Sequence, residues 1–457
     1  MTTAMAETTD LLQHLIRNAC VNEGTITSGG EVRNVDTLMA YLQAPGVEMK
    51  RYEPEPGRGS FVLRIEGSDP KAPTLLLMGH ADVVAANPAG WRHDPFGGEL
   101  IDGVVWGRGA VDMLNVTASM AVAVRRLIDS GFKPKGTLLY SAMADEEALG
   151  TYGAKWLTDN AWDDVRCDYV VTEFGGARLP LPTTGGVKLP LMVAEKGSNW
   201  IQLRVKGTPS HGSMPLRTDN AVVKAAEVIR RVATYRPAYR LGDNWQRFVA
   251  GMEFPDELRT KLLRSEGMYE TLQGLPIGVA REFDAVLHTT FAPTIVKGGT
   301  KINIIPDTAE VQIDIRTVPG DERAEVRTML REAVGDLWEH VEITNEGDNP
   351  ATSSPLDTPL WDVLSTVSAK LVPGSQTVPG TIVGATDSRF FRRKGAVAYG
   401  YGLLSEKISY NDFMGMFHGN DERVDQESLR LCVELWEQTA RAFVGGAVAP
   451  VAPVARR

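Results

Sequence analysis

The chain has 457 residues, 43% of them hydrophobic and 23% charged, and a formal net charge of −10. Its length and composition predict a globular protein of two or three domains with a large buried core. The acidic balance argues against a nucleic-acid partner, because a phosphate backbone requires a basic surface, and it permits a small anionic substrate bound at a local positive site.

The N-terminal residues contain neither a basic segment followed by an apolar one nor a long apolar run. We therefore expect no secretory signal, no membrane span and a cytoplasmic protein. The three cysteines, Cys20, Cys167 and Cys432, are widely spaced and form no CxxC pair. They predict free thiols in a reducing compartment, so that any metal is held by histidines and carboxylates.

Strands and helices alternate in the first part of the chain. Residues 1–8 are predicted to fray, and Thr9 is predicted to cap a helix through Ile16. Another helix, with one apolar side, is predicted over 116–128. Apolar runs predict buried strands over 74–78, 137–143, 169–172 and 396–401. The alternation predicts an α/β sheet covered on both faces, with the ligand crevice at the C-terminal ends of the strands.

The pattern changes near residue 192 and predicts a small α+β domain inserted into the α/β domain. Its predicted strands and helices lie over 198–205, 220–235, 294–304, 310–316 and 321–338. We expect a catalytic domain over 9–192 and 347–444, and an inserted domain over 193–346 that looks enlarged by about 236–290. The Gly-, Ala- and Pro-rich residues 445–457 are predicted to form a flexible tail.

His80 and Asp82 follow the first of the apolar strands, in Gly79-His80-Ala81-Asp82-Val83-Val84. His80 is well placed to bind a metal. The Asp82 carboxylate, two residues on, can accept the other ring N–H and orient the imidazole. By itself, a His near an Asp is more typical of a structural hydrogen bond.

Further acids and a second histidine occur in four places. Asp112 lies in a Gly-rich turn, where its carboxylate can bridge two cations or cap a helix. Glu146 and Glu147 follow an apolar strand, where one can bind a metal and the other can take a proton, although such a run is unremarkable on a solvated face. Glu173 follows the strand at 169–172, and His418 lies beside a Gly turn. Together these residues supply nitrogen and oxygen ligands for two divalent ions.

The ordered motifs GHADVV, GRGAVDM, DEEALG, VVTEFGG and FHGNDERV resemble the M20 family of metallopeptidases and aminoacylases over about residues 10 to 443. That family includes carboxypeptidase G2-like enzymes, acetylornithine deacetylase and succinyl-diaminopimelate desuccinylase. The resemblance implies a mixed-sheet, phosphorylase/hydrolase-like catalytic domain with a dinuclear metal site and an inserted ferredoxin-like lid. It also implies two sets of zinc ligands that share Asp112, namely His80, Asp112 and Glu173, and Asp112, Glu147 and His418. In this reading Glu146 is the general base and Asp82 the orienting acid.

The resemblance extends to the inserted domain. There His211, within TPSHGSMP, matches a loop whose histidine stabilises the oxyanion, commonly in the partner's active site. Asn303 and Arg316 match residues that bind the substrate carboxylate, and Arg389 matches a segment at the substrate end of the cleft. These matches imply a homodimer formed through the lid. By its type alone, His211 reads as a surface turn residue.

Two departures weaken what the resemblance implies about the pocket and the dimer. Leu114-Asn115 replaces the usual Lys-Gly after Asp112, and the lid looks enlarged. The implied activity is hydrolysis of an amide bond next to a free carboxylate, in an N-acyl amino acid, dipeptide or short peptide. The metal is expected to be Zn²⁺, with Co²⁺ or Mn²⁺ as alternatives. Two other readings are a ureido- or amidino-amidohydrolase of the same superfamily and a catalytically silent binding protein.

Overall fold

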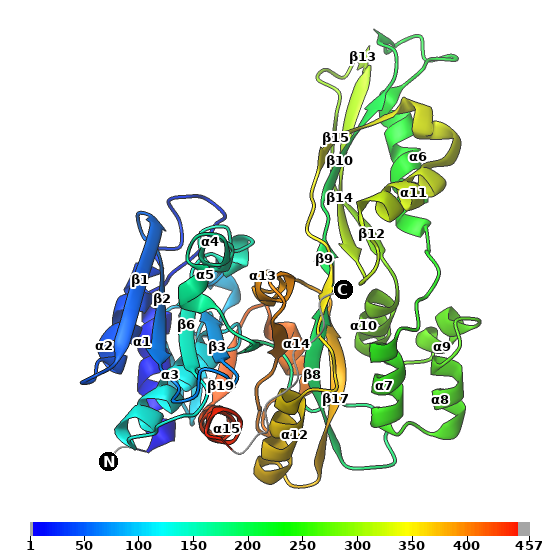
Figure 1. Ribbon diagram of the computed structural model, residues 1–457. Coiled ribbons are helices and arrows are strands. Elements are labelled where there is room, and N and C mark those ends of the chain that lie inside the picture. Colours follow the sequence, from blue (N-terminus) through cyan, green and yellow to red (C-terminus); the bar gives the residue numbers. More distant parts are fainter. Residues whose placement is uncertain (1–2, 447–457) are drawn as a thin grey trace.

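The computed structural model describes residues 3–446, and most of the predicted tail lies outside them. Within this range nine strands form one mixed sheet, in the order β1-β2-β6-β3-β7-β18-β8-β16, with β17 also paired to β8 (Figure 1). Their bounds are β1 Glu48–Glu55, β2 Arg58–Ile65, β3 Leu75–His80, β6 Leu138–Met143, β7 Tyr169–Thr172, β8 Val187–Glu195, β16 Thr352–Ser353, β17 Ser375–Ile382 and β18 Val397–Gly400. The predicted mixed α/β fold is confirmed.

The four strands predicted from apolar runs are neighbours at the centre of this sheet. β6, β3, β7 and β18 lie side by side and run parallel. All residues of β3, β6 and β7 are buried, which explains why these segments are apolar without alternation. Since the strands are parallel, their C-terminal ends meet at one edge of the sheet.

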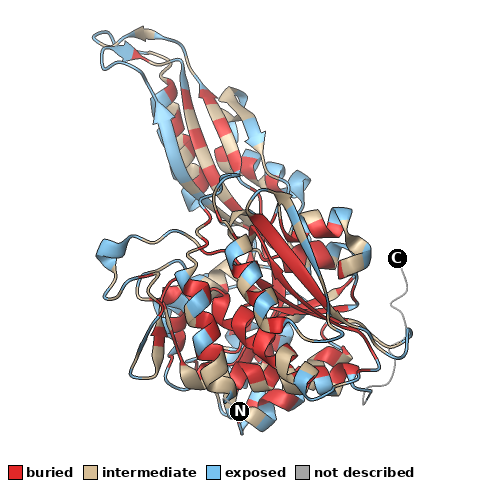
Figure 2. Ribbon diagram, turned by 90° about the vertical axis from the view of Figure 1, so that its left-hand side faces the viewer, coloured by how far each residue is buried: buried red, intermediate tan, exposed pale blue. Residues whose placement is uncertain are grey.

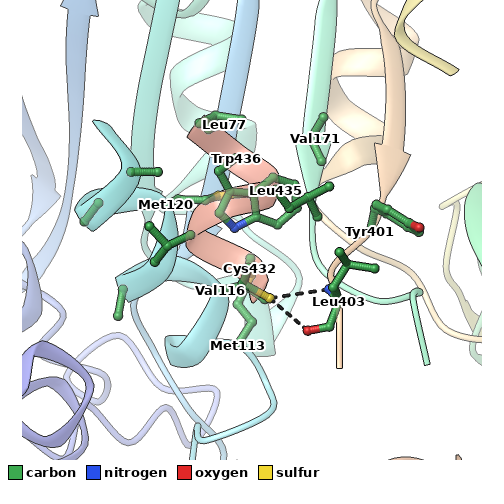
Figure 3. Packing of buried hydrophobic residues seen from close by; sticks show 14 of the residues in the cluster. Leu77, Met113, Val116, Met120, Val171, Tyr401, Leu403, Cys432, Leu435 and Trp436 are labelled. Carbon is green, nitrogen blue, oxygen red and sulfur yellow. Dashed lines mark hydrogen bonds between the residues drawn. The ribbon is translucent and has the colours of Figure 1, made fainter. Parts of the chain in front are cut away.

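Helices cover both faces of the large sheet. One face packs against α1 (Ala4–Arg17), α2 (Val32–Leu42), α3 (Leu114–Asp129), α12 (Pro359–Leu371) and α15 (Gln426–Val444). Figure 3 shows Trp436 of α15 between Met120 of α3 and Leu77 and Val171 of the sheet. Its indole N–H donates to the Ser119 hydroxyl at 3.1 Å, so this large ring is buried without an unpaired polar atom. The opposite face packs against α4 (Ala154–Asn160), α5 (Trp162–Val165) and α13 (Ser388–Arg393).

The first helix begins earlier than predicted. Thr3, not Thr9, is its N-cap, and the Thr3 side chain accepts the N–H of Ala6 at 3.3 Å. Thr9 lies inside α1, where its hydroxyl donates to the Met5 carbonyl at 2.8 Å. The prediction that residues 1–8 fray was therefore wrong from Ala4 onward, because a threonine can bond to the carbonyl four residues back as well as cap a helix.

A second, antiparallel sheet projects from the body of the molecule (Figure 1). Its order is β12-β14-β10-β15, with β9 paired to β14, and α6 and α11 pack against it. The bounds are β9 Gly197–Ser198, β10 Ile201–Lys206, α6 Ala221–Thr234, β12 Thr290–Gly298, β14 Thr308–Thr317, α11 Arg323–Val334 and β15 Val341–Glu346. In Figure 2 its strands alternate between buried and more exposed residues, whereas the centre of the large sheet is buried throughout.

Some predicted boundaries in this part were wrong. The strand expected over 294–304 ends at Gly298, and Ile304–Ile305 (β13) pairs instead with Ser210–His211 (β11). The helix expected to end at 338 is α-helical only to Val334 and continues as a 3-10 turn.

Residues 236–290 form four helices, of which α7 packs on β17 of the large sheet. They are α7 Asp243–Met252, α8 Asp256–Leu262, α9 Met268–Gln273 and α10 Ile277–Leu287. Their own core contains Trp245, Phe248 and Phe283, and it includes Val378 of β17. The segment expected to enlarge the small domain therefore covers the β17 side of the large sheet, and the predicted domain boundaries themselves stay predictions.

Candidate metal centre

Three of the predicted ligands follow neighbouring parallel strands. His80 is the last residue of β3, Glu147 lies in a 3-10 turn over Glu146–Ala148 after β6, and Glu173 directly follows β7. His80 and Glu173 are 1% and 3% exposed. The parallel topology thus brings together side chains that are up to 93 residues apart in sequence, since their strands end at the same edge.

Asp112 lies in the loop between β5 (Val104–Trp106) and α3, and this loop is held by Glu422. The two Glu422 carboxylate oxygens accept the backbone N–H groups of Gly109, Val111 and Asp112, at 2.6–2.9 Å. They also accept a hydrogen bond from Arg108 at 2.8 Å. Sequence analysis missed this role of Glu422, although the residue lies within the FHGNDERV motif; an acid fully buried next to a Gly-rich loop becomes evident only in the fold.

Asp112 lies between the two histidines. Its Oδ1 is 3.4 Å from His80 Nε2, and its Oδ2 is 3.4 Å from His418 Nε2. His418 Nε2 is also 3.1 Å from Glu147 Oε2, and His80 Nε2 is 3.7 Å from Glu173 Oε2. Two groups of ligand atoms therefore form, each with its atoms within 4.8 Å of one another: His80, Asp112 and Glu173, and Asp112, Glu147 and His418. These are the two predicted sets, sharing Asp112.

Asp82 is a buried acceptor beneath the centre. His80 Nδ1 lies 3.0 Å from the Asp82 carbonyl oxygen and 3.4 Å from the Asp82 carboxylate. That carboxylate accepts the backbone N–H groups of Glu146 and Glu147 at 3.3 and 3.2 Å, and the Asn22 side chain at 2.8 Å. Asp82 therefore orients the turn that carries both glutamates as well as contacting His80. Asn22 was not singled out from the sequence, because it comes from a loop 60 residues away.

A buried ionic network lies under the same turn. Arg58 donates to Glu31 at 2.8 Å and to Asp145 at 2.5 Å, and all three side chains are at most 3% exposed. Asp145 has a φ of +69°, a conformation that favours glycine. Its side chain accepts a hydrogen bond from Asn22, and its backbone N–H donates to Glu31, both at 3.1 Å. The first acid of the run Asp145-Glu146-Glu147 is thereby structural, while the other two face the site.

Without a cation, the buried carboxylates of the centre repel one another. Burial, together with the nearby Asp112, raises the pKa of Glu147 to about 7 and that of Glu173 to about 8. Contacts with Asp112 and Glu147 raise the pKa of His418 to about 10. Such a cluster retains protons that a divalent cation would displace.

The residues present fit two divalent cations. Among residues 3–446, Glu147 Oε1 and Glu173 Oε2 are buried oxygens without a hydrogen-bond partner, and both lie in the predicted ligand groups. Imidazole nitrogens and carboxylate oxygens suit zinc and similar first-row metals. Glu146 belongs to neither ligand group.

The predicted substrate residues fall in two places. His211 and Asn303 are exposed and lie at β11 and β13, at the far end of the projecting sheet (Figure 1). Within one chain the structure does not bring His211 to the metal centre. Arg316 lies on β14, where it donates to Asp314 at 2.8 Å and to the Ser198 hydroxyl at 2.6 Å. Arg389 lies on α13 and is 2% exposed.

Arg389 is close to a second residue that sequence analysis did not single out, Asp387. Neither carboxylate oxygen of Asp387 has a hydrogen-bond partner within the described part of the chain, and the same is true of Arg389 Nε. Burial raises the pKa of Asp387 to about 7. Buried unpaired groups of this kind mark a place where a ligand completes the hydrogen bonding.

The sequence matches the model of peptidase family M20/M25/M40 over residues 76–442. The chain belongs to this family. Relatives include the N-fatty-acyl-amino acid synthase/hydrolase PM20D1 of Xenopus tropicalis, 27% identical over 84% of this chain and 75% of that protein. Aminoacylase-1 of Sus scrofa is 24% identical over 87% of this chain and 86% of that protein. This M20 protein is thus a hydrolase of the metallopeptidase and aminoacylase type.

Solved structures show the same fold. The M20 family metallo-carboxypeptidase Sso-CP2 of Sulfolobus solfataricus superimposes with a TM-score of 0.71 at 16% identity, over 97% of this chain and 99% of that one. The Bacillus subtilis protein YXEP, a dinuclear metal-binding peptidase of the M20 family, gives a TM-score of 0.61 at 15% identity, over 96% and 99%. Among the helices of residues 3–446 of the M20 protein, none is long and apolar enough to cross a membrane.

Proposed function

We propose that this M20 protein binds two divalent metal ions, Zn²⁺ in the first instance, and hydrolyses an amide bond next to a free carboxylate. The substrate would be an N-acyl amino acid, a dipeptide or a short peptide. The observation that carries the proposal is the position of Asp112, whose two oxygens face two different histidines, each with a further buried or half-buried acid. A bridging carboxylate is what two adjacent cations require.

The bound ions would supply Lewis-acid polarisation of the carbonyl and a water of lowered pKa. The proton is handled by Glu146. Burial and the nearby Glu173 carboxylate raise the pKa of Glu146 above its usual range. A carboxylate of raised pKa is a stronger base, and Glu146 would take a proton from the water and return it to the leaving nitrogen. In the overall reaction the water oxygen ends on the acyl carbon and both products are released as acid and amine.

The substrate carboxylate is assigned to Arg389, assisted by Arg316 and by Asn303 of a second copy of the chain, because Asn303 lies beside His211 at the far end of the projecting sheet. Arg389 supports this role because its guanidinium is buried and keeps an unpaired N–H. An arginine fork pairs with a carboxylate through two parallel hydrogen bonds. The names of the relatives, an N-fatty-acyl-amino acid synthase/hydrolase and an aminoacylase, also refer to amides of amino acids.

His211 is proposed to stabilise the oxyanion in the site of a second copy of the chain. Its Nδ1 accepts the backbone N–H of Ser213 at 3.1 Å, which leaves the proton on Nε2, the atom that would donate to an oxyanion. The homodimer would form through the projecting sheet, whose edge strand β12 exposes Ile295 and Val296. A cytoplasmic location is supported by the three buried free cysteines.

A metal-reconstituted hydrolysis screen tests the activity. Metal-stripped protein loaded with Zn²⁺, Mn²⁺ or Co²⁺ should release an amino acid from at least one N-acyl amino acid or dipeptide. Release of ammonia or urea from a ureido compound instead would move the function to the other branch of the superfamily. Binding of no metal would refute the proposal. For the dimer, mixing His211→Ala with Glu146→Gln chains should restore part of the activity only if His211 acts across subunits.

A further inference from the structure

Two phenylalanines lie next to predicted metal ligands that belong to different sets. Phe174 directly follows Glu173, which is used only by one set, and Phe417 directly precedes His418, which is used only by the other. The two rings stack, with their centroids 4.5 Å apart and their planes inclined by 11°. Glu173 and His418 come from distant parts of the chain, and this stack joins the residues beside them.

Two residues at this place have a left-handed backbone without being glycine. Phe174 has a φ of +69° and His418 a φ of +55°. For a residue with a bulky side chain this conformation is an outlier, and it persists only where the surroundings hold it. Phe174 is followed by Gly175 and Gly176, which adopt their positive φ without a steric cost. Since glycine has no side chain, the Phe174 ring is what can anchor the turn after Glu173.

The loop of the shared ligand borders the same stack. Val111, the residue before Asp112, lines a cavity of about 20 Å³ together with Phe174 and Phe417. On another side Phe413 packs edge-on against Phe417, with the ring centroids 4.9 Å apart and the planes at 85°. The neighbours of three predicted ligands thus form one closely packed group.

His418 depends on packing for its position more than His80 does. The His80 side chain is 1% exposed, and its Nδ1 lies 3.0 Å from the Asp82 carbonyl oxygen. The His418 side chain is 60% exposed, and the hydrogen bond that it makes within residues 3–446 uses Nε2, the atom that faces the centre. Since residues that orient a metal ligand change the affinity for the metal, the ring that fixes the chain before His418 should do so too.

We propose that Phe174 and Phe417 are positioning residues that couple the two metal sites through their stacked rings. Each ring then supports the ligand beside its partner as well as the ligand beside itself. The inference deepens the proposed function and rests on its two metal ions. It goes beyond the sharing of Asp112, because the stack joins two ligands that the sets do not share. Loss of either ring should therefore weaken both sites.

The sharpest test disables one site and then changes the ring beside the disabled ligand. Glu173→Gln protein is expected to keep the site that contains His418. In that background Phe174→Leu alters only the neighbour of a ligand that no longer binds. Chelator competition should nevertheless show that the affinity of the remaining site for Zn²⁺ falls about tenfold, at the low end of what supporting residues contribute. An unchanged affinity would overturn the inference.

The reciprocal test uses the other ring. His418→Ala protein should keep the site that contains Glu173, and Phe417→Leu in that background should lower its Zn²⁺ affinity by a similar factor. In the otherwise unchanged chain, the double variant of both rings should lose no more affinity than either single variant, since the rings act as one unit. Additive losses would mean that each ring supports only its own neighbour, and would overturn the coupling.

Phe443→Leu is the matched control. Phe443 is 2% exposed and packs edge-on against Tyr169 at 4.8 Å, at the opposite end of β7 from Glu173. Its loss should lower Tm at least as much as Phe174→Leu does, while the affinity for Zn²⁺ changes by less than about twofold. An equal loss of affinity in the control would assign the effect to general loosening of the fold and overturn the inference.

Metal binding by the unchanged chain separates failure of this inference from failure of the proposed function. A chain that binds no Zn²⁺ would overturn the function itself. A chain that binds two ions and hydrolyses an amide keeps the function. If Phe174→Leu then weakens binding only while Glu173 is present, the coupling through the rings is refuted and the function stands.

Discussion

Replacing Glu422 with glutamine should weaken both the fold and the metal centre. Each oxygen of this buried carboxylate accepts two hydrogen bonds, from Val111 and Asp112 on one side and from Gly109 and Arg108 on the other. In the amide one oxygen becomes an NH₂ group, so two donors lose their acceptor and Arg108, 2% exposed, loses its counter-charge. Two lost hydrogen bonds to a charged group cost about 3–6 kcal/mol. Breaking a buried ion pair costs about 3–5 kcal/mol, which agrees.

The expected result is a Tm lower by about 6–10 °C, at about 2 °C per kcal/mol for a chain of this size. Since Glu422 holds the backbone N–H of Asp112, metal affinity should also fall about 10- to 100-fold. Thermal unfolding of the metal-stripped protein and a chelator competition measure the two effects. Glu406→Gln is the control, because this acid pairs with Arg178 while 79% exposed and should change Tm little. Unchanged metal affinity in Glu422→Gln would refute the reasoning about the Asp112 loop.

Three further results are expected. In the metal-free protein the pKa values of Glu147 and Glu173 rise from 4.5 to about 7 and 8, so its stability should fall as pH rises from about 4.5 to 8. The Tm difference between metal-loaded and metal-free protein should therefore widen from pH 5 to pH 8, and a constant difference would contradict this. Glu146→Gln should lower kcat by about 10²- to 10⁴-fold with metal content unchanged, as measured by elemental analysis; loss of metal would remove Glu146 from the role of base. Asp112→Asn should weaken both metal sites in equilibrium dialysis, whereas Glu173→Gln should leave one intact; equal losses would argue against a shared ligand.

Local sequence carried much of the information about the centre. Short apolar runs are buried strands because a strand with helices on both faces has no solvent side. His80 ends such a run, Glu173 directly follows one, and Glu147 lies in the turn after a third. Their closeness could be expected because each strand end is a local feature and parallel strands place such ends together. Their roles as metal ligands followed from the family resemblance and stay predictions. The order of the motifs then indicated the family, which the match over residues 76–442 confirms.

Other features depended on contacts between distant segments. Glu422 meets Asp112 across 310 residues, and Asn22 meets Asp82 across 60, and neither pairing leaves a local pattern. Residues 236–290 were expected to enlarge the small domain, yet α7 among them packs on β17 of the large sheet. A helix's periodicity shows which face is buried but not against which element. Strand ends are determined by the chain itself, whereas the partners of a buried acid or an apolar helix face are chosen only when the sheet assembles.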